Sequence, residues 1–231
     1  MPTAIITGAS RGLGLALARA LAQRGWKLVL DARGADELAL AAGGIRRVAG
    51  CIAEVRAIPG DVALDWHRGA LIDAAGPQID LLVNNASALG PSPQPELARY
   101  PLAELERVYA VNLLAPLALT QLALPLIPDG GCVVNLTSDA AVEPYEGWGG
   151  YGSSKSALDQ LHRVLAIEEP GLSVYQFDPG DMRTAMHQAA FPGEDISDRP
   201  EPESVVPSFR ALLASGAPSG RYQANAWVPQ S

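Results

Sequence analysis

Apolar and polar positions follow two rhythms along this chain. Short segments that are apolar on both faces, such as residues 3–7 and 79–83, predict strands buried within a parallel sheet. Longer segments with apolar residues at helical spacing, such as residues 12–24, lie between the strands and predict helices. Strands that alternate with helices form βαβ units, so the pattern predicts an α/β fold with a doubly wound parallel sheet.

The same two patterns extend over the whole chain. Further strands are expected at residues 27–32, 54–58, 131–137, 172–177 and 221–228. Further helices are expected at residues 36–48, 66–74, 102–124, 152–167 and 203–214. Residues 191–207 are rich in proline, glycine and acids, and they predict a long excursion of the chain. No repeat or linker interrupts the alternation, so residues 1–231 are expected to form a single domain.

The composition is typical of a globular protein, with 48% hydrophobic and 18% charged residues. A net charge of -8 argues against nucleic acid or an anionic membrane as a partner. No apolar run reaches the roughly 18 residues of a membrane span, and we expect no signal peptide. Cys51 and Cys132 suit neither a disulfide framework nor a metal site, which favours a cytoplasmic location. The histidines have no metal-ligand spacing either, so no metal is expected.

A glycine-rich turn follows the first expected strand, where residues 7–14 read Thr-Gly-Ala-Ser-Arg-Gly-Leu-Gly. Glycines allow a tight turn and let the backbone approach a diphosphate, while the following helix contributes free N–H groups and the positive end of its dipole. The position of this turn predicts a dinucleotide site and a Rossmann fold. The residues expected to line the site are Gly8, Ser10, Arg11, Gly12, Leu13 and Gly14.

Tyr151 and Lys155 stand four residues apart in an expected helix, so they share one face of it. A phenol titrates near ~10, and a nearby ammonium favours the phenolate, so we expect Lys155 to lower the pKa of Tyr151. Such a phenol can act as a general acid or base on an alcohol or carbonyl oxygen. A surface helix with an unrelated tyrosine and lysine would show the same spacing, so the pair needs support from the rest of the chain.

That support comes from motifs that follow one another along the chain. Residues 61–62 (Asp-Val), 84–86 (Asn-Asn-Ala) and 179–184 (Pro-Gly-Asp-Met-Arg-Thr) each follow an expected strand, while Asn112 lies in the long helix and Ser138 ends the fifth strand. With the glycine turn and the Tyr151–Lys155 pair, they resemble the short-chain dehydrogenase/reductase superfamily in its compact form, over about residues 4–228. Ser87 departs from the resemblance, because the family usually has glycine there, and its Cβ is expected to affect the cofactor or the pocket wall.

The resemblance implies a role for each of four catalytic residues. Tyr151 would be the acid/base, and Ser138 would hold the substrate oxygen. Lys155 would hold the nicotinamide ribose, and Asn112 would support a helix kink and a water of the proton relay. A substrate-covering loop is implied at about residues 181–207. Separately, Tyr145 and Trp148 precede Tyr151 in the sequence, and they are candidates either for the pocket wall or for packing within their own loop. Further cofactor contacts are implied for Asp61, Val62, Asn84, Ala86, Pro179, Gly180 and Thr184.

Two interpretations of the adenosine ribose site compete. Asp31 lies 23 residues after Gly8, a distance typical of the acid that binds the ribose of NAD. Alignment with the family instead puts Ala32 at the position of the acid, with Arg33 next to it. Arg11 lies in the glycine turn, and two guanidinium groups suit a 2′-phosphate. The sequence therefore favours NADP(H) over NAD(H).

The resemblance implies an NADP(H)-dependent oxidoreductase that interconverts a carbonyl and a secondary alcohol of a small molecule. It also implies a homodimer or homotetramer that packs through residues 102–124 and 152–167. Two alternatives stay open: a cofactor-binding sensor or signalling protein with the same fold, and a reductase of an imine or C=C bond. The fold does not determine the substrate. The complete catalytic set favours an enzyme, because a sensor would not need all four residues.

Overall fold

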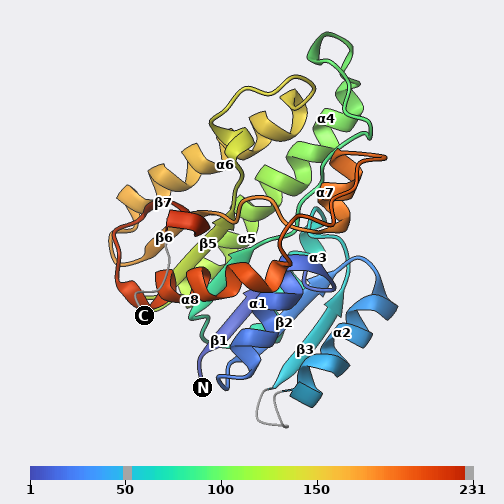
Figure 1. Ribbon diagram of the computed structural model, residues 1–231. Helices are drawn as coiled ribbons and strands as arrows, with labels where there is room; N and C mark the ends of the chain where they lie inside the picture. The colour runs from blue at the N-terminus through green and yellow to red at the C-terminus, as the bar shows by residue number, and fades with distance from the viewer. Residues whose placement is uncertain (49–53, 227–231) are drawn as a thin grey trace.

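A single parallel sheet organises the chain in the computed structural model, which describes residues 1–48 and 54–226 (Figure 1). The strand order is β3-β2-β1-β4-β5-β6-β7, which confirms the expected doubly wound α/β fold. The order reverses between β1 and β4, and ligands of such sheets bind at the carboxyl ends of the strands near this switch point. The strands are β1 (Thr3–Ile6), β2 (Lys27–Ala32), β3 (Val55–Pro59), β4 (Leu81–Asn84), β5 (Cys132–Leu136), β6 (Ser173–Asp178) and β7 (Gly220–Gln223).

Helices cover both faces of the sheet (Figure 1). One face carries α1, α2 and α8, which contribute to one buried cluster, and the other carries α3 and α5, which contribute to a second. The helices are α1 (Gly12–Ala22), α2 (Ala35–Val48), α3 (Asp65–Ala75), α4 (Leu102–Tyr109), α5 (Ala115–Ala123), α6 (Gly149–Glu168), α7 (Ala185–Ala190) and α8 (Val206–Ser215).

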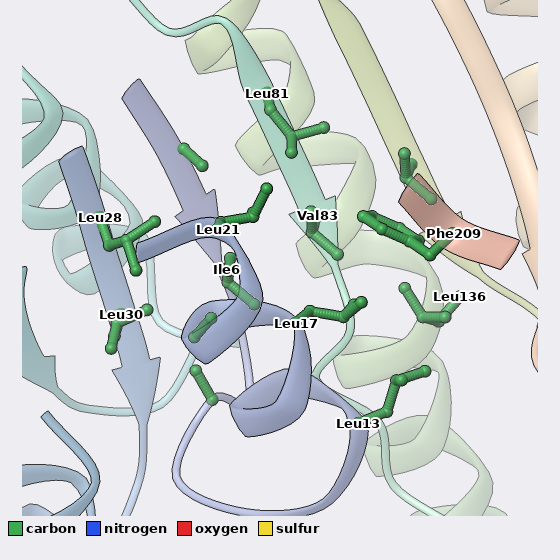
Figure 2. Packing of buried hydrophobic residues seen from close by; sticks show 14 of the residues in the cluster. Ile6, Leu13, Leu17, Leu21, Leu28, Leu30, Leu81, Val83, Leu136 and Phe209 are labelled. Carbon is green, nitrogen blue, oxygen red and sulfur yellow. The ribbon is translucent and has the colours of Figure 1, made fainter. Parts of the chain in front are cut away.

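Helix α1 is fixed by an apolar stripe that faces the sheet. Leu13, Leu17 and Leu21 recur at every fourth position, so they share a face and pack with strand residues such as Ile6 (Figure 2). Each is at most 6% exposed, and burying a leucine stabilises the fold by about 1.5–3 kcal/mol. This packing holds the start of α1, and with it the glycine turn, against the carboxyl end of β1.

The long helix expected at residues 102–124 is present but interrupted. A π-helical turn at Ala110–Leu114 separates α4 from α5, and Asn112 lies in it, fully buried. Pro116 at the start of α5 lacks the N–H of a regular helix interior, which explains why the helix widens just before it. By length and composition the segment Leu102–Leu126 is apolar enough to cross a membrane, and in this structure it packs against α3 and α6.

The end of the chain differs from expectation. A strand was expected at residues 221–228, whereas β7 stops at Gln223 and Ala224–Ala226 forms a 3-10 turn. The sequence Ala-Asn-Ala has low strand propensity, and among the described residues β7 pairs with β6 alone, so little favours a longer strand. Residues 227–228 lie outside the described part of the chain. The other expected strands and helices agree with the structure to within three residues at each end.

Candidate active site

The motifs singled out in the sequence meet at one edge of the sheet. The glycine turn follows β1, Arg33 follows β2, Asp61 follows β3, and residues 84–86 end β4. Ser138 follows β5, and residues 179–180 follow β6. Because all these strands are parallel, their carboxyl ends lie along the same edge, and the glycine turn and residues 84–86 occupy its switch point.

The glycine turn is a close-packed cradle. Gly8 has a φ of +66°, and a Cβ there would lie 2.9 Å from the Cα atom of Ala86. A Cβ at Gly14 would lie 2.5 Å from the carbonyl oxygen of Gly8. Asn85 clamps the turn, since its Nδ2 atom donates to the carbonyls of Thr7 at 2.8 Å and Gly8 at 3.1 Å. This role of Asn85 was not predicted from the sequence, although the residue lies within the Asn-Asn-Ala motif.

Asn84 lies differently from Asn85. Its side chain is buried and donates to Asn135 Oδ1 at 2.9 Å and Thr120 Oγ1 at 3.3 Å. The side chain therefore joins β4 to β5 and α5 inside the fold. A cofactor contact from Asn84 would have to come from its main chain. Ala86 does face the glycine turn, since its N–H donates to the hydroxyl of Thr7 at 2.9 Å.

The start of α1 fits a phosphate group. Arg11 at the N-cap provides no side-chain cap, and the first turn contains no acidic residue. The N–H groups of the first turn have no partner within an α-helix, so they can bind an anion there. On the other side of the turn, the methyl group of Thr184 would lie 3.6 Å from a Cβ at Gly12. Thr184 and the cradle are therefore close enough to hold one ligand between them.

Asp31 is not placed to bind a ribose. It is 2% exposed, its Oδ1 atom lies 2.6 Å from His67 Nε2, and its Oδ2 atom accepts from the N–H of Gly8 at 3.3 Å. Burial raises the pKa of Asp31, and the contact with His67 opposes that change. The carboxylate thus supports the glycine turn from beneath. Arg33, by contrast, is exposed directly after β2, so the structure disagrees with the interpretation of Asp31 as the ribose acid.

Tyr151 and Lys155 lie side by side on α6, as the spacing predicts. They are 8% and 2% exposed, and the Nζ atom of Lys155 lies 5.6 Å from the centre of the Tyr151 ring. The hydroxyls of Ser87 and Ser138 lie close enough to the phenol of Tyr151 to lower its pKa. The structure therefore brings together an acid, a cation and two hydroxyls at the end of β5.

The proton affinities of this pair depart from expectation. Burial raises the pKa of Tyr151 to about 12, and the carboxylates of Asp178 and Asp139 act in the same direction. Burial lowers the pKa of Lys155 to about 8. The Nζ atom of Lys155 donates to the carbonyl of Leu136 at 2.7 Å. The pKa of Tyr151 lies above its usual value, in contrast to the expected lowering by Lys155, because burial is the largest effect. The phenol is therefore protonated at neutral pH and can donate a proton.

Asn112 connects the loop after β4 to α6. Its Oδ1 atom accepts from the N–H of Ala88 at 2.7 Å and from the Ser87 hydroxyl at 3.2 Å. Its Nδ2 atom donates to the Ala88 carbonyl at 2.9 Å and to the Ser154 hydroxyl at 3.0 Å. Ser87, the departure from the family, thus contacts both Asn112 and Tyr151, and its side chain becomes part of the site.

Aromatic side chains form a wall beside the phenol. Trp148 lies 5.8 Å from Tyr151 and 5.8 Å from Phe191, measured between ring centres. His187 on α7 extends the wall, with its ring centre 4.9 Å from that of Phe191. Tyr145 lies 6.4 Å from Trp148. The wall links the loop before α6 to α7, so Trp148 lines the site and does more than pack its own loop.

Asp139 places a carboxylate at the mouth of the site. Its Oδ1 atom accepts from the Ser138 hydroxyl at 2.8 Å, and its Oδ2 atom accepts from the Tyr145 hydroxyl at 2.9 Å. The Ser138 hydroxyl is thereby held close to the phenol of Tyr151. A proton-donating phenol beside a glycine turn that can bind a dinucleotide is the arrangement that a nicotinamide-dependent oxidoreductase requires.

Comparisons with known proteins identify the family. The family model described as short chain dehydrogenase matches residues 2–195. A sepiapterin reductase from Meriones unguiculatus is 37% identical over 200 residues, which cover 80% of this chain and 76% of the relative. A 3beta-hydroxysteroid dehydrogenase 1 from Eggerthella lenta is 31% identical over 238 residues, which cover 98% of this chain and 85% of the relative.

Solved structures agree with this assignment. The crystal structure of a putative short chain dehydrogenase from Escherichia coli CFT073, complexed with NADPH, superimposes with a TM-score of 0.87 at 28% identity. The superposition covers 96% of each chain. The chain belongs to the short-chain dehydrogenase family of oxidoreductases.

Proposed function

We propose that this protein is an NADPH-dependent reductase that converts a carbonyl group of a small molecule to a secondary alcohol, and catalyses the reverse reaction. The observation that carries the proposal is the protonated phenol of Tyr151 in contact with the Ser138 hydroxyl, at the strand edge that holds the glycine cradle. When bound, NADPH supplies the hydride for the carbonyl carbon. The residues of the chain orient the substrate and provide the proton.

Ser138 and Tyr151 meet the carbonyl oxygen. As negative charge develops on that oxygen, the Ser138 hydroxyl turns from Asp139 to the substrate, and both hydroxyls can then donate hydrogen bonds that strengthen toward the transition state. Tyr151 then gives its proton to the oxygen. Burial keeps this proton on the phenol at neutral pH, and an alkoxide is a stronger base than a phenolate, so the transfer is favourable. Lys155, buried one turn further along α6, is proposed to hold the nicotinamide ribose, and Asn112 to carry the proton relay.

The preference for NADPH rests on charge around the ribose end of the site. Arg33 and Arg11 are both exposed at the strand edge and can approach a 2′-phosphate. Asp31, which would repel that phosphate, is turned inward to His67. The structural relative from Escherichia coli was solved with NADPH, which supports the same assignment here. The remaining proposed contacts of the cofactor are Gly8, Ser10, Gly12, Leu13, Gly14, Asp61, Val62, Asn84, Ala86, Tyr151, Lys155, Pro179, Gly180 and Thr184.

The aromatic wall supports a substrate with a flat or apolar body. Trp148 and Phe191 offer ring faces next to the phenol, and Asp139 adds a hydrogen-bond acceptor at the mouth. The relatives named sepiapterin reductase and 3beta-hydroxysteroid dehydrogenase suggest two ring systems to test first. The loop at 181–207, which begins beside this wall, is proposed to cover the substrate.

The experiment measures oxidation of NADPH and of NADH with sepiapterin, a 3-ketosteroid, and simple ketones, aldehydes and quinones. Tyr151→Phe removes only the proton-donating hydroxyl, so we expect turnover to fall at least a hundredfold while NADPH still binds. Tyr109→Phe, a change of the same size on α4, is the matched control and should keep wild-type turnover. Equal activity in Tyr151→Phe would refute the proposed chemistry. NADPH binding without turnover on any carbonyl would favour the sensor alternative.

A homodimer or homotetramer in the cytoplasm is part of the proposal. The faces of α4 to α6 carry exposed apolar side chains that a partner copy would cover, as expected from residues 102–124 and 152–167. A monomeric mass by gel filtration with light scattering would exclude this assembly. The exposed apolar residues on these faces of α4 to α6 include Leu102, Leu114, Leu122, Leu161, Val164 and Ile167.

A further inference from the structure

Arg221 on β7 connects three elements of the site through one partly buried guanidinium group. Its Nη2 atom donates to the main-chain carbonyl of Ser138 at 2.7 Å and to Asp178 Oδ2 at 2.9 Å. Its Nε atom donates to Asp159 Oδ2 at 3.3 Å. The side chain of Arg221 is 13% exposed, and those of both aspartates are 4% exposed. Because β6 lies between β5 and β7, the side chain of Arg221 reaches from β7 across the end of β6 to Ser138, which follows β5.

Each partner of Arg221 controls a different catalytic feature. The carbonyl of Ser138 belongs to the residue whose hydroxyl contacts the phenol, so fixing the carbonyl restricts where that hydroxyl points. Asp178 accepts from the N–H of Gly180 at 3.0 Å through its other oxygen, and so shapes the turn after β6. Asp159 lies one helical turn after Lys155 on α6.

The charges of this cluster act on the acid/base pair. The carboxylate of Asp178 raises the pKa of Tyr151, and the carboxylate of Asp159 raises the pKa of Lys155. Arg221 lies against both carboxylates and offsets their field. The charged groups that face the pair are Lys155 and Asp159 on α6, Asp139 after β5, Asp178 at the end of β6, and Arg221 on β7.

We propose that Arg221 is a positioning residue for the proton transfer. It holds the main chain of Ser138, and its positive charge offsets the negative charges of Asp178 and Asp159 near the Tyr151–Lys155 pair. The proposal rests on the reductase function proposed above. It adds a requirement that lies on the last strand, distant in sequence from the catalytic motifs. Without Arg221, two buried carboxylates would lose their shared cation, and both would stabilise the protonated states of Tyr151 and Lys155.

The direct test follows the titration of Lys155 by NMR of the lysine side-chain carbons. Lys27 and Lys155 are the only lysines of the chain, so two signals are expected and Lys27→Met assigns them. Arg221→Met keeps an unbranched side chain but removes the charge, and it should raise the pKa of Lys155 by about one pH unit. Asp159→Asn removes a carboxylate and should move the same pKa downward. Arg107→Met, at an exposed ion pair on α4, is the matched control and should leave it unchanged.

Kinetics give the second readout. Arg221→Met should lower kcat about tenfold or more with little change in the KM for NADPH, and the pH profile of alcohol oxidation should move to higher pH. Arg221→Lys, which restores the charge, should recover part of kcat. A folded Arg221→Met protein with unchanged kcat and an unmoved Lys155 pKa would overturn the inference. So would a loss of activity that only parallels a loss of folded protein, with the pKa unmoved.

The two proposals fail in different ways. A wild-type protein that reduces no carbonyl would refute the reductase function, and it would do so whatever the NMR titration of Lys155 shows. A wild-type protein that does reduce carbonyls, together with an Arg221→Met variant that matches it in titration and in kcat, would refute only the inference about Arg221.

Discussion

Lys155→Met should inactivate the protein and make it more stable near neutral pH. Lys155 is 2% exposed, and burial lowers its pKa from 10.5 to about 8. At 1.36 kcal/mol for each pH unit, this corresponds to about 3 kcal/mol that the buried ammonium costs the fold at pH 7. Methionine has a similar length and no charge. Its introduction leaves the Leu136 carbonyl without its donor, which costs about 1–2 kcal/mol, so the net gain is about 1–2 kcal/mol.

The stability difference between Lys155→Met and the wild type should change with pH. Below pH 8, Lys155 is charged in the folded and the unfolded chain, and the wild type carries the full cost of burying the charge. Between pH 8 and 10.5 only the unfolded chain keeps the proton, so the wild type becomes more stable relative to the variant as the pH rises. Over this window the advantage of Lys155→Met should disappear and then reverse, by about 3 kcal/mol in total.

Urea unfolding at a series of pH values, with thermal melts beside it, measures the effect. For a chain of this length, a gain of about 1–2 kcal/mol near pH 7 raises the Tm by about 2–8 °C. Lys27→Met, at the only other lysine, is the control: it loses the hydrogen bond to the Ala75 carbonyl, and its stability difference from the wild type should stay constant across the window. A Lys155→Met protein that is less stable at pH 7, with a difference from the wild type that does not vary with pH, would refute the reasoning.

Three further predictions concern the cofactor cradle and the core. Arg33→Ala should raise the KM for NADPH about tenfold while the KM for NADH changes little, and an equal change for both cofactors would contradict the assignment of Arg33 to the 2′-phosphate. His67→Leu removes the hydrogen bond of His67 to the buried carboxylate of Asp31, which keeps the N–H of Gly8 as a partner, so it should lower the unfolding free energy by about 1–3 kcal/mol and weaken NADPH binding, as measured by urea titration and fluorescence. Phe209→Ala leaves a cavity at a buried position of α8, so it should lower the unfolding free energy by about 3–5 kcal/mol, as measured by urea unfolding. The folded variant should bind NADPH as tightly as the wild type, and a lower affinity would contradict this prediction.

The alternation of strands and helices was predictable because it depends on local pattern. Parallel strands must bury both faces, so their apolar runs stand out between helical segments. Several of the motifs follow expected strands. Because parallel strands end on the same side of a sheet, the structure brings the glycine turn and Ser138 to one edge.

Features that depend on side-chain direction were not predictable. Asp31 and Arg33 stand two residues apart, yet the first points into the fold toward His67 and the second lies exposed. Arg221 has no motif, because its partners come from β5, β6 and α6, and only the folded chain brings them together. The proton affinity of Tyr151 was misjudged for the same reason. Spacing shows that a cation is near, whereas burial determines which effect is larger.

The two halves of the site differ in how firmly the protein holds them. The Asn85 side chain and the Thr7 hydroxyl tie the glycine cradle to the end of β4, so this half already has its binding shape. The opposite half rests on α7, a helix of six residues with none buried, which contacts the rest of the site through Ala190, the adjacent Phe191 and the Ser92 hydroxyl. A preformed cradle loses little entropy on binding, whereas α7, with none of its residues buried, is held by fewer contacts and has more entropy to lose when a substrate binds beside it. The dinucleotide should therefore bind first and leave last, with each substrate molecule entering and departing over a cofactor that is already in place.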